Sequence, residues 1–172
     1  MQITNLSTII GFLENTTPDY KGRFHMEILK FTDKELEECH DQIQWMFPLH
    51  EDSAFAETYP VLTPSVVDAC VRSGAVKKNM ILGANRMSKF YGFGLDNSPI
   101  HKRWASDQLG RPNHNLLRIT RIIRSLRFMS LEDEAKQFYK FAFEIATQQK
   151  LGNKTFEYWD KAMTDYVWAS LR

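Results

Sequence analysis

The sequence is poor in cysteine and has no long apolar run. Its two cysteines, Cys39 and Cys70, are too few for a disulfide framework or a cysteine-based zinc site, so we expect two free thiols in a reducing compartment. No segment approaches the roughly 18 apolar residues that a membrane span needs. The first residues also lack the basic region and the cleavage site of a secretory signal. These absences predict a soluble, intracellular (cytoplasmic) protein without a transmembrane segment.

A strong net charge is also missing, because 22 basic residues balance 21 acidic ones. The overall charge therefore indicates no class of partner. Glycine and proline are sparse, with 8 and 6 residues, and 43% of the chain is apolar, which excludes disorder for most of it. The 172 residues fit one domain over 1–172. The aromatic share of 13% predicts a core built largely on ring side chains.

Hydrophobic periodicity is helical nearly throughout, and no stretch alternates as a strand would. Capping residues, glycines and prolines divide the pattern into helices over 2–14, 18–29, 32–46, 63–74, 75–91, 113–128, 130–149 and from 155 onward. Residues 92–112 form the one long irregular loop, a type of segment that often carries function. The sequence therefore predicts an all-α fold, a compact irregular bundle of six to eight helices.

Two segments carry a recognisable pattern. Leu36–Leu49 reads LEECHDQIQWMFPL, and His114–Ile123 reads HNLLRITRII. They resemble the hallmark segments LExxHDYIQWLFPL and HNxLRITRIL of the opioid growth factor receptor family. Shorter similarities lie at 62–63, in the FYG of 90–92 and in FEYWDKAM, so the resemblance covers about 20–168. One departure follows the second segment, where the family's Gly-Leu-Glu is Ser130-Leu131-Glu132.

The resemblance implies a function of binding rather than catalysis. Vertebrate members of the family are described as intracellular receptors for an enkephalin peptide, associated with membranes and the nuclear envelope. It therefore implies a receptor-family domain with peptide-binding activity and no cofactor, and peripheral membrane or nuclear association by analogy. The long repetitive tail of those receptors is absent from this sequence. Oligomeric state and the physiological ligand are left open.

A polar group in the first motif is the first candidate site. On one continuous helix, Glu37, His40 and Asp41 would lie near one face, at spacings of three and four residues. With residues of the second motif they form a candidate binding cluster of Glu37, His40, Asp41, Gln44, His114, Asn115, Arg118 and Arg121. We favour a buried, hydrogen-bonded cluster. The alternative is a metal-dependent enzyme using Glu37, His40, Asp41 and His114, or acid–base chemistry at His40, although no second Glu-x-x-His occurs.

A basic segment is the second candidate site. Between 101 and 131, seven basic residues face Asp107 alone, a local net charge of +6. We favour a structural role for Arg118 and Arg121, partly buried against carboxylates such as Glu37 and Asp41. The alternative is a surface for an acidic protein, a phospholipid headgroup or nucleic acid, made by Lys102, Arg103, Arg111, Arg124 and Arg127. Finally, we expect the helices near 36–46 and 114–128 to pack centrally with their polar residues together.

Overall fold

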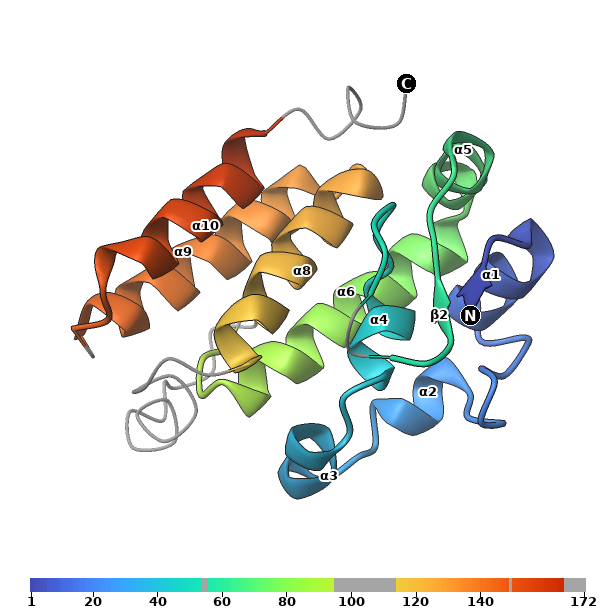
Figure 1. Ribbon diagram of the computed structural model, residues 1–172, viewed down its shortest axis with the longest axis horizontal. Coiled ribbons are helices and arrows are strands. Elements are labelled where there is room, and N and C mark those ends of the chain that lie inside the picture. The colour runs from blue at the N-terminus through green and yellow to red at the C-terminus, as the bar shows by residue number, and fades with distance from the viewer. Residues whose placement is uncertain (54–55, 95–113, 149, 166–172) are drawn as a thin grey trace.

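The chain folds into short and long helices, as a computed structural model shows for residues 1–53, 56–94, 114–148 and 150–165 (Figure 1). Within these residues there are nine helices, and the all-α prediction is confirmed. They are α1 (Leu6–Leu13), α2 (His25–Ile28), α3 (Asp33–Glu38), α4 (Gln42–Met46), α5 (Pro64–Arg72), α6 (Gly74–Phe90), α8 (His114–Phe128), α9 (Glu132–Gln148) and α10 (Asn153–Thr164). The predicted loop over 92–112 lies outside the described residues from position 95 onward.

Several helix starts follow directly from the local sequence. The Thr32 hydroxyl accepts from the Glu35 amide while the Glu35 carboxylate accepts from the Thr32 amide, the reciprocal pair of a capping box. Thr63 caps α5, and Pro64 takes its first position, where a missing N–H costs nothing. Ser73 ends α5 and also caps α6. The prediction that Gly74 ends a helix was therefore wrong, since that glycine begins the next one.

The first predicted helix is shorter than its apolar pattern suggested. Asn5 caps α1 by accepting from the Thr8 amide at 3.0 Å, so the helix begins at Leu6. The residues before it instead form β1 (Gln2–Ile3), which pairs in parallel with β2 (Tyr59–Pro60). A period-2 signal cannot be seen in a two-residue strand, and this pairing depends on a segment more than 50 residues away.

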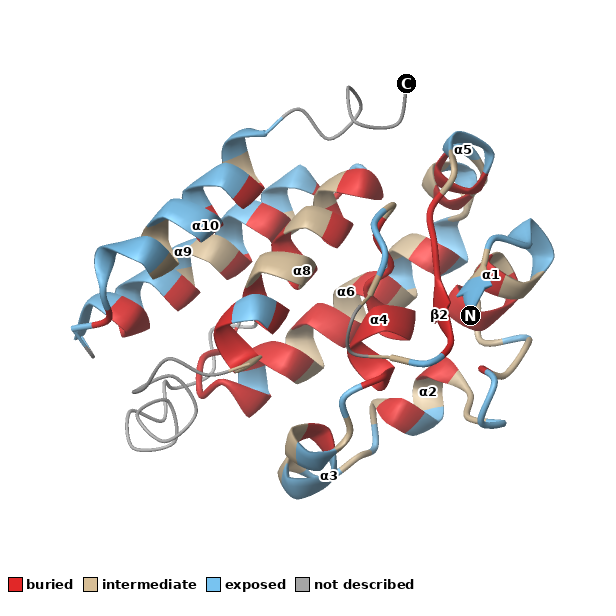
Figure 2. Cartoon of the chain, viewed as in Figure 1, coloured by how far each residue is buried: buried red, intermediate tan, exposed pale blue. Residues whose placement is uncertain are grey.

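The helices form two groups around a continuous apolar core. In the C-terminal group, α8 packs against both α9 and α10. In the N-terminal group, α1, α5 and α6 pack together, and α6 also reaches α9 beneath α8 (Figure 1). Buried residues line the inner faces of α8, α9 and α10, while the outer faces of α9 and α10 are exposed (Figure 2). Rings join the two groups, because Phe93 packs edge-on against Phe138 of α9 at 5.2 Å.

Two helix boundaries in the C-terminal part of the chain also differ from the prediction. Ser130 does not cap α9 but closes α8: the Ser130 amide donates to the Arg127 carbonyl and the Leu131 amide to the Leu126 carbonyl, both at 3.0 Å. This is a Schellman closure, with Ser130 at a positive φ of 56°. The family's glycine at this position is explained, because glycine adopts that conformation without steric cost. The last helix begins at Asn153 after Gly152, not at Thr155.

Candidate functional site

The largest correction concerns the predicted helix over 32–46. It is divided into α3 and α4, because Cys39 has an extended backbone with φ −86° and ψ 118°. With this division the described residues contain nine helices, one more than the upper limit of the predicted six to eight. Glu37 and Asp41 are therefore not neighbours on one helical face, and the candidate polar cluster separates into two groups. One group contains Glu37 and His40 and faces α8, and the other surrounds Asp41.

Arg118 stabilises the break between α3 and α4. Its guanidinium donates to the carbonyls of Leu36 and Cys39, each at 2.9 Å, and to that of Glu37 at 3.4 Å. These carbonyls are at the end of α3, where a helix leaves acceptors without partners. Arg118 is only 5% exposed, so a distant side chain caps the helix from inside the protein. It has the buried structural role we favoured, but its partners are carbonyl groups rather than the predicted carboxylates.

Two glutamines of the first motif also form hydrogen bonds with the backbone at the break. The Gln42 side chain donates to the Leu36 carbonyl at 3.2 Å. With its amide nitrogen toward the break, Gln44 donates to the carbonyls of His40 at 2.8 Å and Asp41 at 3.0 Å. Both glutamines are buried, as is the rest of α4 (Figure 2). Gln44 was predicted as a binding residue, and its place in the structure is a support for the backbone at one edge of a cavity.

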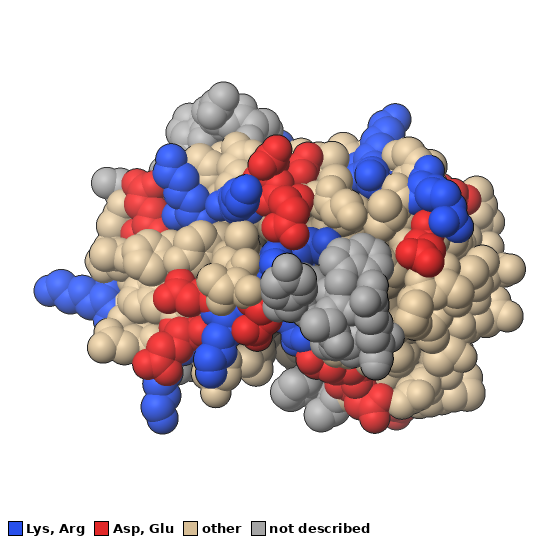
Figure 3. All heavy atoms as spheres, turned by 90° about the horizontal axis from the view of Figure 1, so that it is seen from above, with Lys and Arg blue, Asp and Glu red and all other residues tan. Residues whose placement is uncertain are grey.

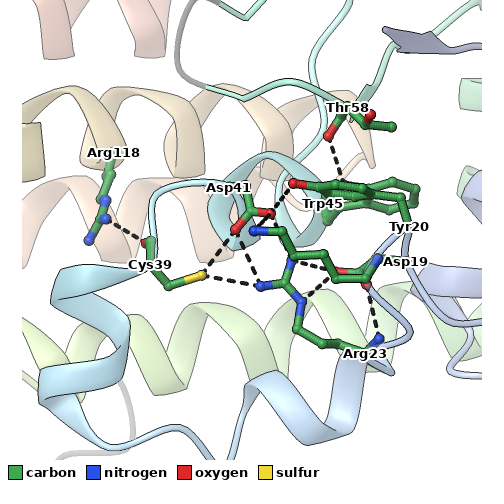
Figure 4. Close-up of polar contacts among 9 residues, drawn as sticks. Asp19, Tyr20, Arg23, Cys39, Asp41, Trp45, Thr58 and Arg118 are labelled. Atoms are coloured by element: carbon green, nitrogen blue, oxygen red, sulfur yellow. Dashed lines mark hydrogen bonds and ion pairs between the residues drawn. The ribbon is translucent and has the colours of Figure 1, made fainter.

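Asp41 lies at the centre of a closed cluster on the other side of the break (Figure 4). Its carboxylate accepts from Arg23 at 3.0 and 3.3 Å, from the Tyr20 hydroxyl at 2.6 Å and from Lys21 at 2.8 Å. Arg23 also pairs with Asp19, and the Cys39 thiol donates to Asp41 at 3.0 Å. Figure 4 shows Arg118 reaching Cys39 from the side opposite this cluster. Below, "the Asp41 cluster" means Asp19, Tyr20, Lys21, Arg23, Cys39 and Asp41.

The charges of the Asp41 cluster stabilise each other. Burial alone would raise the pKa of Asp41, but hydrogen bonds from Lys21, Tyr20, Cys39 and Arg23 hold it well below its usual range. Burial alone would lower the pKa of Arg23, but Asp19 and Asp41 raise it above its ordinary value. Both groups are thus ionised at neutral pH. A carboxylate with this many donors is a poor proton acceptor and a poor metal ligand.

The remaining candidate residues meet beside the N-terminus of α8. The Glu37 carboxylate accepts from the Asn115 amide at 3.0 Å, and its other oxygen lies 3.2 Å from His114 Nε2 without hydrogen-bond alignment. The rings of His40 and His114 meet edge to face at 5.1 Å. His40 Nδ1 lies 3.2 Å from the Arg118 guanidinium. Burial, and then the Arg118 charge, lower the pKa of His114, which is therefore neutral at neutral pH.

The residues predicted as metal ligands do not converge. Asp41 belongs to its own cluster, while Glu37, His40 and His114 lie beside Arg118. Among the described residues, no group of three or more His, Cys, Asp or Glu side chains is placed to hold a metal ion. A guanidinium beside the two histidines also opposes binding of a second cation. The geometry thus gives no support to the metal-dependent enzyme using Glu37, His40, Asp41 and His114.

The predicted anion-binding arginines on α8 already have acceptors within the protein. Arg124 forms a two-pronged pair with Glu51, at 2.5 and 2.9 Å. Arg127 pairs with Glu132 and donates to the carbonyls of Ala162 and Asp165. Acidic and basic side chains also lie interspersed on the face in Figure 3. The other three predicted residues, Lys102, Arg103 and Arg111, lie outside the described residues.

A cavity of about 300 Å³ opens between the chain after α4 and the outward face of α8. Residues of both motifs line it, among them His40, Ile43 and Leu49 from the first, and His114, Leu117 and Arg121 from the second. Glu51, Asp52 and Ser53 continue the wall beyond the first motif. The lining thus combines apolar side chains with charges of both signs, as binding pockets commonly do.

Sequence reasoning missed part of both regions. Tyr20 and Arg23 were not predicted as partners of Asp41, although an acidic and a basic residue four apart at Asp19 and Arg23 gave a weak signal. Glu51 was also missed, because no local pattern links it to Arg124 on a helix 73 residues away. The prediction that the two motif segments meet is correct, since Ser125 of α8 donates to the Pro48 carbonyl and Arg121 to that of Phe47.

Comparison with known proteins now identifies the two motifs. The sequence model of the family described as "Opioid growth factor receptor (OGFr) conserved region" matches residues 12–171. The chain belongs to this family. It is 34% identical over 124 residues to the opioid growth factor receptor of Rattus norvegicus, which covers 67% of this chain and 21% of the rat protein. No solved structure gives a significant match.

Other relatives give the same family with similar coverage. The opioid growth factor receptor of Mus musculus is 36% identical over 124 residues, 67% of this chain and 19% of the mouse protein. The opioid growth factor receptor-like protein 1 of Mus musculus is 29% identical over 141 residues, 78% of this chain and 28% of that protein. The chain thus matches about a fifth to a quarter of the length of these relatives. Within the described residues, no helix has the length and apolar character to cross a membrane.

Proposed function

We propose that this chain is a non-enzymatic receptor-family domain that binds a peptide through the cavity between Leu49–Ser53 and α8. The observation that carries the proposal is the meeting of both family motifs at this cavity. Ile43, Leu49 and Leu117 supply apolar surface, while Arg121 and Glu51 supply opposite charges. A peptide carries the same combination of apolar side chains, charged ends and amide groups. The relatives' printed name, opioid growth factor receptor, supports a peptide of that class.

Binding is favoured over catalysis by the state of the polar side chains. The Asp41 carboxylate is fully engaged with three donors besides the Cys39 thiol, and its depressed pKa makes it unsuited to accept a proton. The Arg118 guanidinium donates to backbone carbonyls and to His40. Arg118 thus forms part of the cavity wall, and Asp41 lies outside the cavity lining.

The test is a binding titration with a fluorescein-labelled enkephalin pentapeptide, followed by anisotropy. Leu117 is 53% exposed in the cavity lining, so Leu117→Glu places a charge there at little cost to the core. We expect saturable binding by the native chain and at least tenfold weaker binding by this variant, because the apolar contact is lost. Leu6→Glu is the matched control, since Leu6 is 39% exposed on α1 outside the cavity lining.

Two results would contradict the proposal. The first is the absence of saturable binding by the native chain at any accessible peptide concentration. The second is equal binding by the native chain and Leu117→Glu, which would place the peptide elsewhere. A scrambled peptide of the same composition shows whether sequence or only charge is recognised.

The second proposal is that an anionic partner binds to Lys102, Arg103 and Arg111. It no longer includes the other two predicted arginines. Arg124 and Arg127 are paired internally, so reversing their charges would disturb the fold as well as a surface. The triple variant Lys102→Gln, Arg103→Gln, Arg111→Gln removes charge without touching those pairs. It is expected to lose binding to nucleic acid or anionic liposomes at low salt. Unchanged binding, or none by the native chain, would reject this proposal.

A further inference from the structure

One arginine in the cavity wall lacks the acceptors that its neighbours have. Among the described residues, Arg121 makes one hydrogen bond, from Nη1 to the Phe47 carbonyl at 3.2 Å, and no ion pair. A guanidinium carries five N–H donors, so most of its capacity is unused. Burial lowers the pKa of Arg121 to about 10, which still leaves it charged at neutral pH. A partly buried positive charge thus lines a cavity without an ion-pair partner among the described residues, although Glu51, which is paired with Arg124, stabilises it from a longer distance.

The neighbouring arginines on α8 have more acceptors, so the shortage of acceptors is specific to Arg121. Arg118, one turn before it, donates to three carbonyls and to Asn115. Arg124, one turn after it, is held by both oxygens of Glu51. Arg121 therefore lies between two arginines that have several acceptors within the protein, while it has one. The charge of Arg124 also raises the positive potential at the Arg121 guanidinium.

The rest of the lining defines the anion that fits. Ile43, Leu49 and Leu117 offer apolar surface, so an apolar group next to the anion would be buried. Glu51 and Asp52 lie in the same wall and would repel a doubly charged phosphate more than a singly charged carboxylate. A volume of about 300 Å³ is at the lower end for ligand pockets and holds one or two residues.

We infer that this cavity binds a carboxylate next to an apolar side chain, as at the free C-terminus of a peptide, with Arg121 as the residue that receives the carboxylate. Because a guanidinium and a carboxylate match as a two-pronged pair, the ligand supplies the acceptors that the protein does not. This inference rests on the proposed peptide-binding function and adds the end of the peptide that is recognised. It also explains why an arginine stands at position 121.

The test compares an acid and its amide in the full-length chain. N-acetyl-leucine and N-acetyl-leucinamide are titrated into isotope-labelled protein, and amide shifts around Leu49, Leu117 and Thr120 are followed by NMR. We expect the acid to bind at least tenfold more tightly than the amide. Arg121→Gln should abolish this preference, while Arg121→Lys should keep part of it. Arg72→Gln, which removes an exposed arginine on α5, should bind as the native chain does.

Three outcomes of the titrations with these two compounds would overturn the inference. They are equal binding of acid and amide, an unchanged preference in Arg121→Gln, and no shifts at the cavity with either compound. The acid–amide comparison in the native chain does not depend on the folding of any variant. A tripeptide acid ending in leucine that binds more tightly than N-acetyl-leucine identifies a peptide end, and equal affinity identifies a small free acid. An amidated peptide that still binds the cavity would overturn this inference while leaving the proposed function intact.

Discussion

The Asp41 cluster and the cavity at Arg121 lie on opposite sides of the break after α3, and they use their charges in opposite ways. In the cluster, two carboxylates, Asp19 and Asp41, surround Arg23 and every charge has a partner. In the cavity, Arg121 donates to one carbonyl and forms no ion pair with any residue that the structure describes. Each region contains a partly buried arginine, so burial alone does not distinguish them. The difference is whether the protein itself supplies the counter-charge.

This contrast separates a structural role from a binding role. Partners within a closed cluster stabilise the fold and leave nothing for a ligand to gain. An unpaired charge in a cavity costs stability in the free protein, and a ligand that pairs with it recovers that cost. The following variants test this contrast in order of their expected effect.

The largest effect is expected when the closed cluster is broken. Asp41→Asn keeps the shape of the side chain but leaves Arg23, Lys21 and Tyr20 without the anion that they share. Because one partner of a buried pair is removed, we expect a loss of about 4 kcal/mol in the free energy of unfolding. Urea unfolding followed by tryptophan fluorescence measures it. Glu38→Gln is the control, since its pair with Lys34 is exposed and 3.8 Å long.

The second test compares two arginines on the same helix. Arg118→Met leaves several carbonyls of the break without donors, and we expect a loss of about 3 kcal/mol. Arg121→Met removes a charge that has no anionic partner, so its effect should stay within about 1 kcal/mol. Thermal unfolding of both variants under one buffer condition gives the comparison. Equal losses would mean that Arg121 is as structural as Arg118.

The third test uses pH on a buried group without partners. His25 is fully buried, neither ring nitrogen has a hydrogen bond within the part of the chain that the structure describes, and burial lowers its pKa to about 4. The unfolded chain takes up a proton near pH 6.5 and the folded chain does not, so stability falls as pH decreases from 6.5 toward 4. We expect about 2 kcal/mol to be lost between pH 7 and 5. His25→Leu should remove most of this slope in unfolding titrations, and an unchanged slope would assign it to other groups.

The smallest effect comes from a variant outside both regions. Ser130→Gly places a glycine where the backbone has a φ of 56°, the conformation that the closure of α8 requires. We expect about 1 kcal/mol of added stability, because a non-glycine residue is strained there. Differential scanning calorimetry would show a higher Tm for this variant. Since it leaves Arg121 unchanged, its ligand affinity should equal that of the native chain.

Much of the architecture could be predicted from local patterns. The capping box at Thr32, the Thr63-Pro64 start and the end of α6 before Gly92 are set by interactions between residues within a few positions of each other. The meeting of the two motif segments was also predicted correctly. The strand pair and the closure at Ser130 were missed, because the first depends on a distant segment and the second on a backbone conformation unusual for serine.

The candidate site was predicted by residue but not by arrangement. Glu37, His40 and Asp41 were grouped on the assumption of one continuous helix, and the break at Cys39 separates them. The break is invisible in the local pattern, because Leu36 to Met46 keeps its helical spacing of apolar residues. Arg118 decides it by donating to carbonyls about 80 residues earlier in the chain. Such a contact exists only after α8 has packed against this segment.

The sequence by itself determined the helical class, several helix boundaries and the family, because these depend on periodicity, capping and contiguous motifs. Only the tertiary structure decided which charges are paired. Local spacing sets which face of a helix a side chain occupies, but the partner of that side chain comes from whichever segment packs there. Arg118, Arg121 and Arg124 show this most clearly. They share one helix at intervals of three residues, yet Arg118 donates to several carbonyls, Arg124 pairs with a carboxylate, and Arg121 donates to one carbonyl.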